Sequence, residues 1–173
     1  MKRKNLVYTV YAALFAALIF VGTYAFKIPT PVGYIHLGDG FIFIAAALLP
    51  TPFALGAALV GAGLSDLVAG FPLWVAPTVI IKCACALCFT SKKIKIFCAR
   101  NIIALAASAA ITVGGYYFFG ALIYSSFVTP LYEIAFNLIQ SVAGIIIFSV
   151  FGIFFDKTPA LRKVIGKARD KTE

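Results

Sequence analysis

Long apolar runs separated by short polar segments dominate the chain and predict membrane-spanning helices. The runs cover about 6–26, 38–49, 53–69, 72–90, 101–124 and 130–155. At about 1.5 Å of rise per residue, the first run and the last two can cross a hydrocarbon core about 30 Å thick. The runs over 38–49 and 53–69 are shorter, and we expect them to be tilted or buried among neighbouring helices.

The segment Pro50-Thr51-Pro52 leaves two topologies to choose between. One kinked span over 38–69 gives five spans, and a hairpin of two short spans gives six. Basic residues gather at the start of the chain, in the stretch 92–100 and in the tail. Six spans place these three clusters on one side of the membrane, as the positive-inside tendency requires, whereas five spans would separate them. We therefore predict an all-α bundle of six transmembrane helices with both termini in the cytoplasm.

The composition agrees with an integral membrane protein. Of 173 residues, 62% are hydrophobic and 12% charged, the net charge is +9 and the mean hydropathy is +1.02. Because the basic clusters adjoin apolar runs, they indicate orientation rather than a nucleic-acid surface. The apolar run that starts at Leu6 is longer than a typical signal-peptide core, so we expect it to be retained. We expect one domain over 1–173, with a basic cytoplasmic tail over 156–173 that could lie on the membrane surface through Leu161, Val164 and Ile165.

Four cysteines lie near the end of one predicted span. Cys83, Cys85 and Cys88 form a C-x-C-x2-C pattern, and Cys98 follows the basic stretch. A metal site is conceivable from this spacing, but no histidine or acidic residue accompanies it. We interpret the cysteines as small packing residues, and we predict no metal and no cofactor.

Ionisable residues inside predicted spans are the strongest functional signal. A charged side chain at the centre of a bilayer costs about 2.5–3.5 kcal/mol on insertion scales, so it needs a partner, water or a ligand. Asp66, Lys82 and Glu133 are such residues, and His36 and Asp39 lie at the predicted outer boundary. Lys82 could be the counter-ion of Asp66 or a ligand contact, and both interpretations stay open.

The last predicted span carries a polar stripe. Glu133, Asn137, Gln140 and Gly144 recur at helical spacing and therefore share one face. Their acid and amide groups could bind a polar heteroaromatic ligand, or they could join neighbouring helices by hydrogen bonds. Trp74 could offer a stacking surface or belong to an interfacial aromatic belt. The sequence shows no nucleophile–base pair at matched depth, so we do not expect an enzyme.

The polar segment Lys27–Gly40 interrupts the apolar pattern in the first half of the chain, and we expect it to form a lid. Its prolines restrict the backbone, and its glycines allow the backbone more conformations. In this hypothesis His36 and Asp39 close over a pocket whose floor is Lys82, Glu133 and Asn137. A bulky residue at Gly38 would then slow ligand exchange without unfolding the bundle.

Small residues form a stripe on the first predicted span. Ala12 and Ala16 share one helical row, and Ala13 and Ala17 share another. Such a stripe lets a second helix approach closely. It could serve packing within the bundle or docking to a partner subunit.

These segments together resemble a known transporter family. The stretches GYIHLGDGFIFIAAALLP and GFPLWVAPTVIIK are similar to the substrate-binding (S) component of energy-coupling factor (ECF) transporters, and most similar to its hydroxymethylpyrimidine/riboflavin-type branch. The resemblance implies a prokaryotic plasma-membrane protein that captures a vitamin or precursor from outside. It further implies delivery after docking to a transmembrane coupling subunit and two ATPase subunits.

The resemblance also implies roles for individual segments. The four alanines of the first span match the docking surface of the family, and Lys27–Gly40 matches its gate. The ligand roles would fall on His36, Asp39, Lys82, Glu133 and Asn137.

The balance of charges at the expected pocket bears on the substrate. Three carboxylates, Asp39, Asp66 and Glu133, face the single cation Lys82. This balance suits a neutral or weakly cationic heterocycle better than an anion, and we expect hydroxymethylpyrimidine or a similar molecule first and riboflavin or another B vitamin second. The alternative is a structural or assembly protein without a ligand, whose polar residues join helices.

Overall fold

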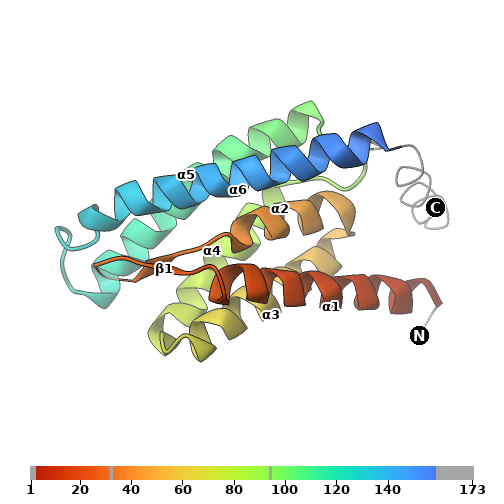
Figure 1. Ribbon diagram of the computed structural model, residues 1–173. Helices are drawn as coiled ribbons and strands as arrows, with labels where there is room; N and C mark the ends of the chain where they lie inside the picture. The colour runs from red at the N-terminus through yellow and green to blue at the C-terminus, as the bar shows by residue number, and fades with distance from the viewer. Residues whose placement is uncertain (1–2, 32, 94, 159–173) are drawn as a thin grey trace.

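The computed structural model describes residues 3–31, 33–93 and 95–158, and in this part of the chain it contains six α-helices and one short hairpin (Figure 1). The helices are α1 (Arg3–Tyr24), α2 (Gly38–Leu48), α3 (Thr51–Val68), α4 (Val75–Cys88), α5 (Ala99–Ile123) and α6 (Leu131–Lys157). Strands β1 (Ile28–Pro29) and β2 (Tyr34–Ile35) pair antiparallel between α1 and α2. A 3-10 turn, Pro72–Trp74, precedes α4.

Successive helices run back and forth along one bundle. Figure 1 shows the start of α1 and the end of α6 at the same end of the molecule, and the β-hairpin at the opposite end. The segment between α4 and α5 lies with the end of α6, because both carboxylate oxygens of Asp156 accept backbone N–H groups of Ile96 and Phe97 at 2.9 Å. We call this end, which carries Lys92, Lys95 and Lys157, the basic end, and the other the hairpin end.

Four of the described helices are long and apolar enough to cross a membrane, namely α1, α3, α5 and α6. Helix α2 has 11 residues, too few to cross a hydrocarbon core about 30 Å thick. Nine of its residues are buried, and it packs against α1, α3, α4 and α6. A helix enclosed by its neighbours does not need to match the thickness of the lipid.

Proline and glycine set the boundaries that the sequence predicted. Pro50 precedes α3 and Pro52 lies in its first turn, where the missing N–H costs nothing. Gly70, with φ of 87°, follows the end of α3 in a backbone conformation that favours glycine. The predicted all-α bundle is therefore confirmed. It remains a prediction that all six helices cross the membrane and that the basic end faces the cytoplasm. The single domain over 1–173 also remains a prediction. From residue 159 onward, the predicted tail lies outside the described residues.

Small residues let the helices approach one another closely. A Cβ on Gly61 of α3 would lie 2.7 Å from the Ala16 carbonyl oxygen of α1, so only glycine permits this approach.

Aromatic residues fill the core towards the basic end, where the Phe89 ring lies 5.0 Å from that of Phe43 and 5.5 Å from that of Phe148. All three rings are buried, and we call them the phenylalanine plug.

Candidate functional site

A buried ion pair between α2 and α4 lies at the centre of the bundle, and a hydrogen bond from α6 extends it. Lys82 Nζ lies 2.8 Å from Asp39 Oδ1 and donates a hydrogen bond of 3.0 Å to Asp39 Oδ2. The side chains of Lys82 and Asp39 are 0% and 1% exposed. Gln140 Nε2 donates a further hydrogen bond of 3.0 Å to Asp39 Oδ2, so α2, α4 and α6 meet at one carboxylate. The counter-ion of Lys82 is therefore Asp39 and not Asp66.

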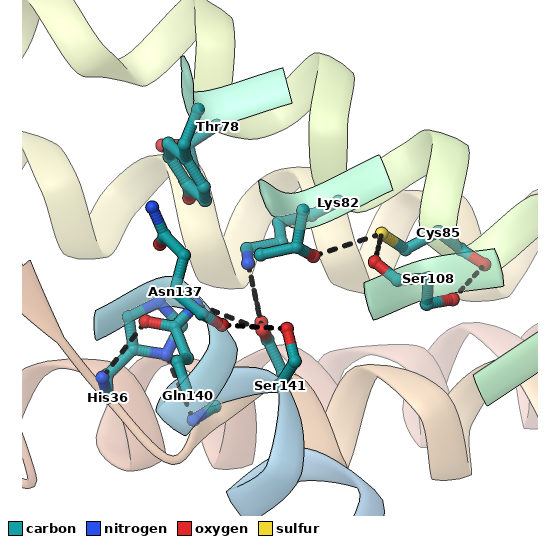
Figure 2. Close-up of polar contacts among 12 residues, drawn as sticks. His36, Thr78, Lys82, Cys85, Ser108, Asn137, Gln140 and Ser141 are labelled. Carbon is teal, nitrogen blue, oxygen red and sulfur yellow. Dashed lines mark hydrogen bonds and ion pairs between the residues drawn. The ribbon is translucent and has the colours of Figure 1, made fainter. Parts of the chain in front are cut away.

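The same network positions the segment that precedes α2. The His36 backbone N–H donates to Gln140 Oε1 at 3.2 Å, and the Gly38 N–H donates to His36 Nδ1 at 3.2 Å. Burial lowers the pKa of His36 to about 4, although the nearby Asp39 charge acts in the opposite direction. His36 is therefore neutral at pH 7, and because Nδ1 accepts, its proton lies on Nε2. Figure 2 shows His36 beside Gln140, and Lys82 reaching from α4 toward α6.

A pocket lies above this network at the hairpin end. It contains about 540 Å³ of empty space, its open mouth included. Its aromatic wall is made by Tyr34, Phe71, Trp74, Tyr116 and Tyr124. Its polar wall is made by His36, Asp66, Thr78, Glu133, Asn137 and Gln140. Aromatic faces beside a few convergent polar groups are typical of sites for small organic molecules.

The pocket brings together most of the residues proposed from the sequence as substrate contacts. His36, Trp74, Glu133, Asn137 and Gln140 all line it. Their participation in binding stays a prediction, because the geometry alone does not show a ligand.

Asp39 and Lys82 are not among the lining residues and lie beneath the pocket, paired with each other. They position Gln140 instead of facing the pocket.

Gly144, the last member of the stripe on α6, packs against α2. A Cβ on it would lie 3.1 Å from the Cβ of Asp39 and 3.2 Å from the Phe43 ring. Its place in the stripe therefore reflects close helix packing.

The β-hairpin is fastened over the pocket at two points. Thr30 Oγ1 donates a hydrogen bond of 2.8 Å to Glu133 Oε1 of α6, and the Tyr34 hydroxyl donates to Asp66 Oδ1 of α3. Glu133 therefore lies at the rim of the pocket and holds the hairpin, whereas the sequence placed it in the floor. Asp39 shows the reverse: it belongs to the floor and was expected in the lid.

Gly38 does not offer the clean test of a lid that the sequence suggested. A Cβ on Gly38 would overlap Thr23 Oγ1 and lie 3.2 Å from the Ile19 carbonyl oxygen. Both atoms belong to α1, so a bulky residue would force α1 and α2 apart. The substitution would disturb the bundle itself.

Several lining residues were not proposed from the sequence as contacts. Among them are Asp66, which the sequence marks only by its charge, and the aromatic residues Tyr34 and Tyr116. One signal could have revealed Thr78: Trp74, Thr78 and Lys82 recur every fourth residue and so share one face of α4 and its preceding turn.

The alanine rows of α1 separate into two groups. Ala16 is buried and Ala12 half-buried, and both pack inside the bundle. Ala13 and Ala17 are exposed. Only the second row is free to contact a partner subunit.

Cys85 of α4 and two polar residues of α5, Ser108 and Thr112, hold these two helices together. The Cys85 Sγ lies 3.6 Å from the Ser108 carbonyl oxygen and 3.6 Å from Thr112 Oγ1. Ser108 Oγ in turn donates to the Cys85 carbonyl oxygen at 3.5 Å. These contacts explain Cys85 by packing between helices.

The comparison with known protein families agrees with this architecture. The family model described as ECF-type riboflavin transporter, S component, matches residues 3–156, which is most of the chain. No curated protein matches the chain. The family comprises substrate-binding components of transporters and is not an enzyme family. The chain therefore belongs to the S-component family of ECF-type riboflavin transporters, and it is a multi-pass protein of a prokaryotic plasma membrane.

Proposed function

We propose that this S component binds a free, planar heteroaromatic B vitamin, with riboflavin as the first candidate, in the pocket at the hairpin end. Import would follow after docking to a transmembrane coupling subunit and two ATPase subunits. The observation that carries the proposal is the pocket itself, which combines an aromatic wall with unpaired polar groups. The description of the family as riboflavin transporters supports the choice of vitamin.

The description of the matching family decides the order of the candidate vitamins. The charge balance of the sequence favours hydroxymethylpyrimidine, whereas the family model is described by riboflavin. For this reason we place riboflavin before hydroxymethylpyrimidine.

The aromatic wall offers stacking surfaces in two groups of rings. The Trp74 ring lies 5.7 Å from that of Tyr116 and 6.2 Å from that of Tyr124, and the Tyr34 ring lies 5.3 Å from that of Phe71. Aromatic side chains at such separations present flat apolar faces to a planar ring.

The polar wall offers groups for the edge of a heterocycle. Among the described residues, the buried Asn137 side-chain amide has no hydrogen-bond partner, and Figure 2 shows it standing clear of the Gln140 network. An amide can both donate to a ring carbonyl and accept from a ring N–H. His36 Nε2–H supplies a further donor.

Hydroxymethylpyrimidine remains the second candidate because of Asp66. Its carboxylate lines the pocket with one oxygen unpaired in the described structure. An aminopyrimidine edge carries N–H donors that would suit such an acceptor.

The docking part of the proposal concerns α1. Its exposed Ala13 and Ala17 would allow a helix of the coupling subunit to approach closely. Because α1 contributes no residue among those lining the pocket, docking there would leave the ligand contacts in place.

Purified protein tests the proposal directly. Riboflavin added to the protein in detergent should lose fluorescence on binding, and mass spectrometry should identify a vitamin that co-purifies. We expect Asn137→Leu to weaken binding about 10- to 100-fold, because the substitution keeps the volume nearly constant but leaves a polar group of the ligand buried without its partner, which costs about 1–3 kcal/mol.

The matched control is Asn5→Leu, which changes an exposed asparagine at the basic end and should leave the affinity unchanged. If neither riboflavin nor hydroxymethylpyrimidine, pyridoxine or thiamine binds, and no vitamin co-purifies, the proposal is wrong and a structural role gains support. Equal affinities of the Asn137→Leu variant and the wild type would remove Asn137 from the site.

A further inference from the structure

Asp66 is a buried acid whose hydrogen bonding is incomplete. Its side chain is 5% exposed and lines the pocket from the last turn of α3. Among the described residues Oδ2 has no hydrogen-bond partner. A buried carboxylate oxygen without a donor is unfavourable, so its retention in a pocket wall points to a donor that arrives with the ligand.

The other groups near Asp66 do not fill this gap. The Tyr34 hydroxyl donates to Oδ1, which leaves Oδ2 for another partner. The Thr78 hydroxyl also lies within hydrogen-bonding reach of the carboxyl, besides its 3.2 Å contact with the Tyr116 hydroxyl, in which either oxygen can donate. Both neighbours of this acid are neutral hydroxyl groups, and Oδ2 has no hydrogen bond of good geometry among the described residues.

No cation pairs directly with Asp66 among the described residues. Lys82 acts on the Asp66 charge from beneath the pocket, but it is held by Asp39 at 2.8 Å. The described residues that line the pocket include no lysine and no arginine, while they include a second acid, Glu133. The electrostatic character of the pocket is therefore acidic, unlike phosphate sites, which use arginine, lysine or helix N-termini.

We propose that Asp66 is the specificity-determining residue of this pocket. Its Oδ2 accepts a hydrogen bond from an N–H or O–H group of the ligand, and its charge excludes ligands that carry a phosphate. The inference rests on the proposed function and names its substrate class: the unphosphorylated vitamin rather than its phosphate ester. Rejection arises because the phosphate and the buried Asp66 carboxylate carry like charges, which repel each other.

The hydrogen bond from Tyr34 couples this selection to the hairpin. Tyr34 belongs to β2, so the same carboxylate that contacts the ligand through Oδ2 holds the hairpin through Oδ1. A ligand that fails to supply a donor would leave an incompletely bonded acid beneath a closed hairpin. Selection of the ligand and closure of the hairpin therefore both depend on the Asp66 side chain.

The test compares each free vitamin with its phosphate ester on the purified protein. The ligand pairs are riboflavin with riboflavin 5′-phosphate, and hydroxymethylpyrimidine with its phosphate. For the pair whose free vitamin binds, we expect the wild type to prefer the free form by at least about 100-fold, as expected for like charges facing each other. Asp66→Asn should weaken binding of the free vitamin and reduce the preference to less than about 10-fold.

Two variants separate the charge from other effects. Glu133→Gln removes the other carboxylate of the pocket, which is half-buried at the rim and bonded to Thr30, and we expect it to reduce the preference less than Asp66→Asn does, because solvent screens its charge more. Tyr34→Phe keeps the ring and the Asp66 carboxylate, and it should speed ligand release while preserving the preference.

The outcomes are distinct. A wild type that binds the phosphate ester as tightly as the free vitamin overturns the inference, even if Asp66→Asn fails to fold. An Asp66→Asn variant that is folded, binds normally and keeps the preference overturns it as well. A wild type that binds none of the free vitamins refutes the proposed function, and the inference with it.

Discussion

Replacing Lys82 by methionine is expected to lower the free energy of unfolding by about 3–5 kcal/mol. The substitution would leave the Asp39 carboxylate fully buried and without its cation, and removing one partner of a buried ion pair has costs of this size. Only the Gln140 amide would remain as a donor to it. The loss should appear as a lower midpoint of thermal or denaturant unfolding in detergent.

A double variant makes this expectation specific to the charge. Lys82→Met combined with Asp39→Asn removes both charges and keeps an acceptor for Gln140, so most of the lost stability should return. Lys92→Met, which changes an exposed lysine at the basic end, should shift stability by no more than about 0.5 kcal/mol. If the single and double variants are equally unstable, Lys82 acts through packing and not through its pairing with Asp39.

Acid is expected to destabilise the protein through His36. His36 lies outside the helices, and burial lowers its pKa from about 6.5 to about 4. The unfolded chain therefore takes up a proton between these two values while the folded protein does not. Stability is fully present above pH 6.5 and is lost as the pH falls toward 4, with about 2 kcal/mol lost between pH 7.5 and pH 5.

The measurement is the unfolding midpoint as a function of pH, compared with His36→Gln. Glutamine keeps a side-chain acceptor but does not titrate, so the variant should lack most of the loss between pH 6.5 and pH 5. Protonated His36 could no longer accept the Gly38 N–H, so ligand affinity should fall over a lower range, near pH 4. Parallel stability curves for wild type and variant would contradict the assignment of this loss to His36.

The sequence predicted the helices well because their boundaries are local. The hydrophobic runs fix the segments, and Pro50, Pro52 and Gly70 mark turns that the chain must make. The two-residue strands of the hairpin escaped prediction, since so short a pair has no periodicity. The hairpin contacts the bundle through the Tyr34 and Thr30 side chains, which reach α3 and α6, and a local sequence pattern does not reveal such contacts.

The depth of individual residues could not be predicted in the same way. The sequence placed Asp39 at the outer boundary because α2 starts at Gly38. In the fold, the segment after the hairpin descends into the bundle, so α2 begins at the level of Lys82, two turns inside α4. Glu133 lies in the first turn of α6 and therefore stays at the rim. Periodicity gives the face of a helix, but it does not give the level at which that helix starts.

The phenylalanine plug has an electrical consequence. A plasma membrane holds a voltage, and one elementary charge that crosses it gains or loses about 2.3 kcal/mol per 100 mV. The pocket is open to solvent at the hairpin end. Between the pocket and the basic end lie the Lys82–Asp39 pair, which is neutral as a whole, and the packed rings of Phe43, Phe89 and Phe148. We expect this packed layer to block the passage of ions. Many copies of the protein can then lie in one membrane without dissipating its proton gradient.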